Sequence, residues 1–144
     1  MLSGSADTTV DNSATLTVYS STAFAMQANT KYRLRGMHWV DTTAAGDFKY
    51  DFTGPTSPTL FRMFRHDAVA SGTAAEVATD VAYFAATARA GTGTTGGLIF
   101  WNAIVHNGAN TATFGFRWAQ NTATGAAGAG ATCRAGSYME YSTA

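Results

Sequence analysis

The chain has few charged residues, and the two signs cancel. Charged side chains make up 12% of the 144 residues, nine basic and nine acidic, so the formal net charge is zero. Binding to nucleic acid needs a clustered basic surface, and the one basic cluster, Lys31, Arg33 and Arg35, is too small to provide it. We therefore expect no nucleic-acid partner. A net charge near zero also favours association between protein surfaces, which points to an oligomer.

Cysteine and long apolar runs are also scarce. Cys133 is the single cysteine, which excludes an intrachain disulfide and a cysteine-based metal site. No apolar run approaches the ~20 residues of a membrane span, and residues 1–10 lack the charged and apolar regions of a signal peptide. We expect no membrane partner. The chain is either made in the cytosol and released by other means, or a fragment.

Strongly alternating segments predict half-buried strands. Lys31–Val40 places aromatic and aliphatic side chains on one face and basic side chains on the other. Met37 and Trp39 lie on the basic face and imply that it also meets protein. Phe48–Phe52 alternates aromatic with charged residues, which predicts one apolar face and one solvated face that includes Asp51.

Other strands are expected where short β-prone segments lie between turn residues. They are Ala14–Tyr19, Thr22–Met26, Leu60–His66, Thr113–Gln120 and Ser137–Tyr141. Leu98–Val105 is a continuous apolar run, which predicts a central strand buried on both faces with Trp101 in the core. The Asn107-Gly108 pair that follows predicts a tight hairpin. The stretch 71–90 fits both a helix and a strand template, and we interpret it as a loop with an edge strand.

These segments predict one all-β domain. Residues 1–12 are small, polar and without periodicity, so we expect an N-terminal arm outside the core. Residues 13–144 then form a single antiparallel β-sandwich or jelly roll of eight to nine strands, because strand patterns recur at regular spacing without intervening helices.

One glycine-rich segment matches a nucleotide-binding motif by its letters alone. Gly91, Gly93 and Gly96 have the G-x-G-x-x-G spacing, but that motif holds a pyrophosphate only where it opens a helix. Here a strand pattern follows, so we interpret the segment as a loop between strands.

Few side chains could carry metal binding or acid–base chemistry. The candidates are His38, His66, His106, Asp41 and Asp67. No two histidines have the His-x-His spacing that places two ligands on one strand face, and adjacent residues of a strand point to opposite faces. The chain also has no Gly-x-Ser-x-Gly elbow. We expect no catalytic residues, no metal and no cofactor, and therefore no enzyme.

The aromatic residues are the remaining feature. Most should fill the sandwich core, and any that lie outside it would be interface anchors, because Tyr and Trp are enriched where protein surfaces are buried on association. We name Trp39, Tyr83 and Tyr141 as candidate interface aromatics. Sugar stacking is a competing use of an exposed aromatic ring, and the sequence does not separate the two.

Several segments of the chain form a recognisable set: DTTVDNSATL (residues 7–16), ANTKYRLRG (28–36), DFKYDFTGP (47–55), the strand entry Gly96-Gly97-Leu98, WAQNT (118–122) and AGSYMEY (135–141). Together they resemble a family of small β domains in tailed-phage structural proteins. The resemblance covers nearly the whole chain and implies a C1q/TNF-like jelly roll that assembles as a homotrimer. Cys133 and the His38-Trp39 pair depart from the family pattern without disturbing the fold.

The resemblance implies a virion structural protein located on the capsid surface. One expectation is a decoration (cement) protein that binds the major capsid protein of a tailed phage and stabilises the head. The alternative is the receptor-binding distal domain of a tail fibre or minor tail protein, which would recognise a host receptor. Within the arm, the candidate docking residues are Leu2, Thr8, Val10, Asp11 and Asn12, which we expect to order on assembly by strand addition to a neighbour.

Overall fold

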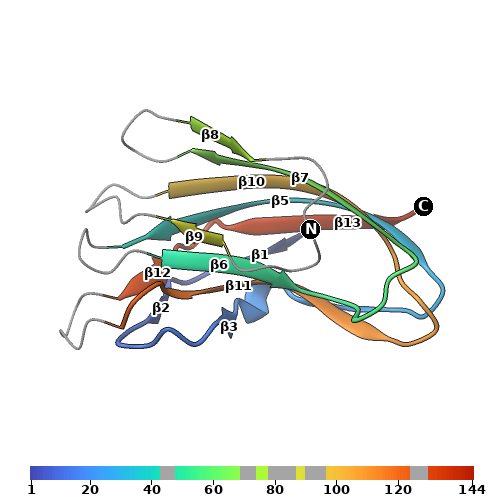
Figure 1. Cartoon of the computed structure of the whole chain (residues 1–144), viewed down its shortest axis with the longest axis horizontal. Helices are drawn as coiled ribbons and strands as arrows, with labels where there is room; N and C mark the ends of the chain where they lie inside the picture. The colour runs from blue at the N-terminus through green and yellow to red at the C-terminus, as the bar shows by residue number, and fades with distance from the viewer. Residues whose placement is uncertain (43–47, 69–73, 78–86, 90–96, 124–129) are drawn as a thin grey trace.

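The computed structural model shows two antiparallel sheets packed face to face around one hydrophobic core (Figure 1). It describes residues 1–42, 48–68, 74–77, 87–89, 97–123 and 130–144. The predicted all-β sandwich is confirmed. The strands are more numerous than the eight or nine expected, because one sheet has eight strands and the other five, several of them only two or three residues long.

The larger sheet contains the longest strands of the chain. Its main order is β1 (Leu2–Ser3), β13 (Tyr138–Thr143), β5 (Lys31–Asp41), β10 (Gly97–His106), β7 (Leu60–Ala68) and β8 (Ala74–Val77). Two further short strands join it beside β5, namely β12 (Ala131–Cys133) and β2 (Thr8–Val10). The long pair β5 and β10 therefore forms the middle of this sheet.

The smaller sheet covers the inner face of the larger one. Its order is β3 (Thr17–Val18), β11 (Ala112–Gln120), β6 (Phe48–Thr53) and β9 (Thr87–Arg89), with β4 (Phe24–Met26) also paired to β11. A single 3-10 turn, η1 (Ser20–Thr22), joins β3 to β4. The segment 71–90 thus contributes β8 and β9, each at an outer edge of its sheet, as the edge-strand interpretation predicted, while residues 78–86, including Tyr83, lie outside the described residues.

The chain crosses between the two sheets repeatedly, from β5 to β6, from β6 to β7 and from β10 to β11, as in a β-sandwich or jelly roll. The predicted hairpin at Asn107-Gly108 is wrong for this reason, because β10 and β11 belong to different sheets. Among the described residues, positive φ occurs only at Asn12, Asn29 and Gly136, so Asn107 does not adopt the hairpin-turn conformation. Its buried side-chain amide instead donates to the Gln27 carbonyl at 3.0 Å, which anchors the crossing between the sheets.

Aromatic side chains from both sheets form the core. The alternation of β6 and β11 points one row of each strand inward, and these residues are Phe48, Tyr50, Phe52, Phe114, Phe116 and Trp118. Trp101 of β10 meets them from the larger sheet, with its ring centroid 4.9 Å from that of Phe52. The prediction that Trp101 lies in the core is confirmed, because only 1% of its surface is exposed.

Asp51 does not lie on a solvated face, contrary to the sequence-based expectation. It is buried, and the Arg117 guanidinium donates to both of its carboxylate oxygens at 2.8 and 2.7 Å from the directly opposite position on β11. Burial raises the pKa of the Asp51 carboxyl, and the Arg117 charge counteracts that shift. A charged residue in an alternating strand can thus be covered when its cross-strand partner neutralises it.

The N-terminal segment is part of the fold rather than an arm outside it. β1 pairs with β13, β2 pairs with β12, and Val10 belongs to the hydrophobic core. Of the proposed docking residues, Leu2 is in β1, Thr8 and Val10 are in β2, and Asp11 and Asn12 are exposed in the turn after it. Their pairing partners, β13 and β12, belong to the same chain. β1 is the outermost strand of the main order of its sheet, so addition of this segment to a neighbour's strand stays a prediction.

His38 is a neutral, fully paired histidine in the core. The Trp101 indole N–H donates to its Nδ1 at 3.1 Å, so Nδ1 is the acceptor and Nε2 carries the proton toward Thr22 Oγ1 at 3.0 Å. Phe116 stacks on the imidazole at 4.0 Å between ring centroids. Burial lowers the pKa of His38 from 6.5 to about 3, because the charged form would lose its hydration in this apolar setting.

We expect His38 to make the fold sensitive to mild acid. The unfolded chain takes up a proton near the ordinary pKa of 6.5, whereas the folded chain does so only near 3. Stability is therefore complete above pH 6.5 and falls as the pH drops toward 3, by about 2 kcal/mol at pH 5. Urea unfolding at pH 7 and pH 5 measures this loss, and His38→Gln should remove most of the difference. An equal loss in both proteins would show that His38 is not its source.

Candidate functional site

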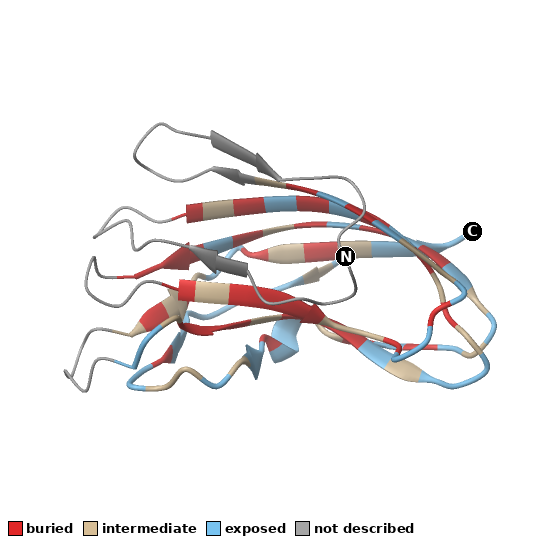
Figure 2. Cartoon of the chain, viewed as in Figure 1, coloured by how far each residue is buried: buried red, intermediate tan, exposed pale blue. Residues whose placement is uncertain are grey.

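The outward face of β10 is the first feature of a candidate site. β10 pairs with β5 on one side and β7 on the other, and its residues alternate between the core and the outside (Figure 2). Phe100 and Ile104 point outward and are 38% and 37% exposed. The prediction that β10 is buried on both faces is therefore wrong for the single chain, although the apolar residues that suggested it are present on the outside.

β7, like β10, has an apolar side chain on its outward face, and it also has a charged side chain on its inward face. Along this strand Arg65 points inward and is only 5% exposed, with its guanidinium 5.4 Å from the centre of the Tyr50 ring. Phe64, its neighbour, points outward and is 41% exposed. A strand that exposes a phenylalanine and buries an arginine departs from the alternation of a sheet with one solvated face.

Outward apolar residues of four neighbouring strands lie together. Phe100 lies opposite Met37 of β5, and Leu98 lies opposite Trp39. Met37 in turn lies opposite Tyr138 of β13. We call this group, with Phe64 of β7, the apolar half of the outer face. Exposed apolar patches of this kind mark sites of protein interaction.

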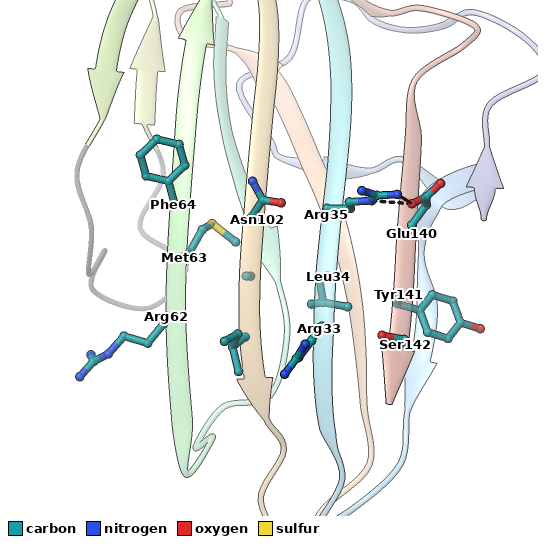
Figure 3. Close-up of a pocket in the computed structure, with 12 residues that line it drawn as sticks. Arg33, Leu34, Arg35, Arg62, Met63, Phe64, Asn102, Glu140, Tyr141 and Ser142 are labelled. Carbon is teal, nitrogen blue, oxygen red and sulfur yellow. Dashed lines mark hydrogen bonds and ion pairs between the residues drawn. The ribbon is translucent and has the colours of Figure 1, made fainter. Parts of the chain in front are cut away.

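The other half of the outer face is basic and hollowed. Arg33 of β5 and Arg62 of β7 both lie opposite Ile104, while Arg35 lies opposite Asn102. A groove of about 680 Å³ lies over this part of the sheet and is lined by residues of β13, β5, β10 and β7 (Figure 3). We call it the outer groove.

One acidic side chain stands at the margin of the outer groove. Glu140 of β13 is directly opposite Arg35, and its carboxylate accepts a hydrogen bond from the guanidinium at 2.5 Å (Figure 3). The Arg35 side chain remains 67% exposed. The pair therefore leaves the arginine accessible, and exposed pairs of this type are worth only about 0.2–1 kcal/mol.

Trp39 is held at the far end of the outer face by a polar network. Its indole N–H donates to Asp41 at 2.8 Å, and Asp41 also accepts a hydrogen bond from Arg134. Arg134 contacts Asp7 at 2.6 Å, and Asp7 accepts a further bond from the Ala135 backbone at 2.8 Å. These bonds to the charged form lower the pKa of the Asp7 carboxyl. The network fixes the orientation of a tryptophan ring that is 43% exposed.

The candidate interface aromatics do not form one cluster. Trp39 belongs to the outer face, whereas Tyr141 stacks on Phe24 of the other sheet at 4.0 Å between ring centroids. Figure 3 shows the Tyr141 ring extending past β13, away from the arginines. The sequence did not single out Phe64, Phe100, Ile104 or Arg62. The run of apolar residues on both faces of β10 was the signal that could have found Phe100 and Ile104.

The histidines and acidic residues considered for chemistry are not assembled. His38 is in the core, His66 lies near the C-terminal end of β7, and His106 ends β10. In the part of the chain that the structure describes, no three His, Cys, Asp or Glu residues are grouped to hold a metal ion. Cys133 is buried, which raises the pKa of its thiol to about 12. Gly91, Gly93 and Gly96 lie outside the described residues.

Membrane-spanning helices and similarity to known proteins were the two remaining possible indications of function. Within the described ranges, no helix has the length and apolar character needed to cross a membrane. No protein-family model, no curated protein and no solved structure matches this chain. The outer face of the larger sheet, with its exposed aromatic side chains and the outer groove, is the site on which we argue a function.

Proposed function

We propose that this protein is a bacteriophage virion structural protein, a decoration protein that binds the major capsid protein on the outside of the head and stabilises the shell. The observation that carries the proposal is the outer face of the larger sheet, where Phe64, Phe100 and Ile104 are exposed beside arginines. A broad face of four strands, with apolar anchors beside a basic groove, suits a protein surface better than a small substrate. The resemblance of the segments to phage β domains supplies the identity of the partner.

A homotrimer is part of the proposal. A decoration protein acts through many modest contacts repeated around a symmetry axis, so avidity takes the place of one strong site. The zero net charge of the chain is compatible with such association. Light scattering should give the mass of a trimer, and a stable monomer at micromolar concentration would contradict this part of the proposal.

Binding to particles tests the role of the outer face. We expect the purified protein to sediment with capsids of the phage that encodes it. The double variant Phe64→Ser/Phe100→Ser should bind at least tenfold more weakly while it keeps its fold, because these rings are partly exposed in the free chain. Val18→Ser is the matched control, since Val18 is also 38% exposed but lies on β3 of the other sheet. Unchanged binding of the double variant would contradict the assignment of the face.

A second candidate is receptor binding by a tail-fibre domain. The exposed Trp39 ring, whose orientation Asp41 fixes, favours it, because sugars stack on such rings beside a polar acceptor. This function predicts binding to intact host cells rather than to capsids, and loss of that binding in Trp39→Ala. The same sedimentation assay, carried out with cells, separates the two candidates.

A further inference from the structure

We propose that the outer groove binds an extended acidic segment of a partner chain, with carboxylates at alternate positions. The inference rests on the proposed function in that it names the chemistry by which the capsid partner would be recognised. It concerns the basic half of the outer face, whereas the apolar half provides the anchors described above.

The spacing of the arginines is that of a strand. Arg33 and Arg35 are two residues apart on the same face of β5, which places their Cα atoms about 7 Å apart. Arg62 is level with Arg33 on the far side of β10, about 10 Å away across two strand spacings. In an extended peptide, side chains on one face repeat with the same interval of two residues. Carboxylates at alternate positions would therefore match Arg33 and Arg35 in register.

Arginine is suited to this partner. Its planar guanidinium binds a carboxylate with two parallel hydrogen bonds, and such charge-assisted bonds are stronger than neutral ones. The Arg35–Glu140 contact at 2.5 Å already shows a carboxylate bound at the margin of the groove. Arg33 lies across from Ser142 and Ile104, which carry no charge. The partner would supply a carboxylate to Arg33, as Glu140 does to Arg35.

Basic residues are concentrated near the groove, although the chain as a whole has no net charge. Four of the nine basic residues lie on this half of the larger sheet, at outward positions of β5 and β7: Lys31, Arg33, Arg35 and Arg62. Ile104 and Phe64 lie between and beside them, so the alternate, uncharged side chains of a peptide would also find apolar contacts. A nucleic acid is the less suitable polyanion, because binding to it needs a larger clustered basic surface than these four residues provide, and the chain as a whole is neutral.

A second copy of this chain does not supply the acidic segment. The nine acidic residues are never closer than four positions in sequence, so no segment places carboxylates on alternate residues. Within the described residues, Asp7, Asp41 and Asp51 are already bound to Arg134 or Arg117. The occupant is therefore a different protein, in agreement with docking onto a capsid surface rather than with contact between subunits.

A short peptide of alternating Glu and Thr tests the groove directly by calorimetric titration of the full chain. We expect it to bind, with affinity that falls as salt is added, and a peptide of alternating Gln and Thr to bind at least tenfold more weakly. Arg33→Gln should weaken binding about threefold to tenfold, and Arg33→Gln/Arg62→Gln by more than tenfold. Lys49→Gln is the matched control, because it removes one positive charge from the other sheet, and it should bind as the unchanged protein does.

Glu140→Gln gives the sharpest result. Glu140 competes with the peptide for Arg35, so its replacement should strengthen binding about threefold, whereas a merely structural role for the pair would leave binding unchanged or weaken it. Binding that is insensitive to Arg33→Gln/Arg62→Gln, or tighter binding of a single-stranded oligonucleotide or heparin than of the peptide, would overturn the inference.

Particle binding distinguishes failure of this inference from failure of the proposed function. If the protein sediments with capsids and Arg33→Gln/Arg62→Gln does so equally well, decoration stands and the acidic-segment inference is wrong. If the peptide binds as expected but capsids do not, the groove is assigned correctly and the capsid is not the partner.

Discussion

Replacing Trp101 with Ala is expected to lower the free energy of unfolding by about 3–5 kcal/mol, as for other large aromatic residues removed from packed cores. The indole packs against Phe52 and Phe114 at centroid distances of 4.9 and 5.7 Å. It also lies directly against Gly36, where an added Cβ would be only 2.6 Å from the indole Cζ2. Its N–H is also the donor to His38 Nδ1. The substitution therefore removes apolar contacts and leaves a buried acceptor without its partner.

Thermal unfolding followed by circular dichroism measures this effect, and a fall of the Tm by about 10–15 °C is expected for a chain of this size. Phe100→Ala is the matched control, because Phe100 is the preceding residue of β10 and points to the outer face. It should cost about 1 kcal/mol or less in the free protein, since the ring is already partly in water. Equal losses in the two variants would contradict the assignment of inward and outward faces on β10.

Deleting residues 1–10 is expected to abolish cooperative folding or nearly so. The deletion removes β1 and β2, the ladder bonds to β13 and β12, and the Val10 side chain from the core. It also removes the Ala6 carbonyl, which accepts from the buried Tyr19 hydroxyl at 3.1 Å. With about 2 kcal/mol for Val10 and about 1 kcal/mol net for each of several hydrogen bonds, the loss reaches about 5 kcal/mol or more, which approaches the whole stability of a typical domain.

Near-UV circular dichroism and urea unfolding of the truncated chain test this expectation. Thr8→Ala in the full-length chain is the control, because Thr8 is exposed and its backbone pairing with Cys133 is kept; its effect should stay within about 0.5 kcal/mol. A truncated chain with an unchanged unfolding midpoint would show that the segment is an arm after all, as its composition suggested.

The contrast between the arm expected and the two strands observed shows where local patterns fail. Residues 1–12 have little hydrophobic periodicity, and β1 and β2 are too short to be recognised by alternation. They are ordered because β13 and β12 present free edges to them, and those edges exist only after the rest of the sheet has formed. The burial of Asp51 is a second case of this kind, because it depends on the ion pair with Arg117, which is sixty-six positions away in the sequence.

The sequence by itself determined the strands with strong alternation and the class of the fold. The apolar rows of β5, β6 and β11 and the position of Trp101 follow from the period of two, since inward and outward faces are a property of the local backbone. Only the tertiary structure decided which strands are neighbours and which sheet each one joins. It brought Arg33, Arg35 and Arg62 to one groove and left the outward side chains of β10 uncovered, because strand pairing over long sequence separation depends on the whole chain at once.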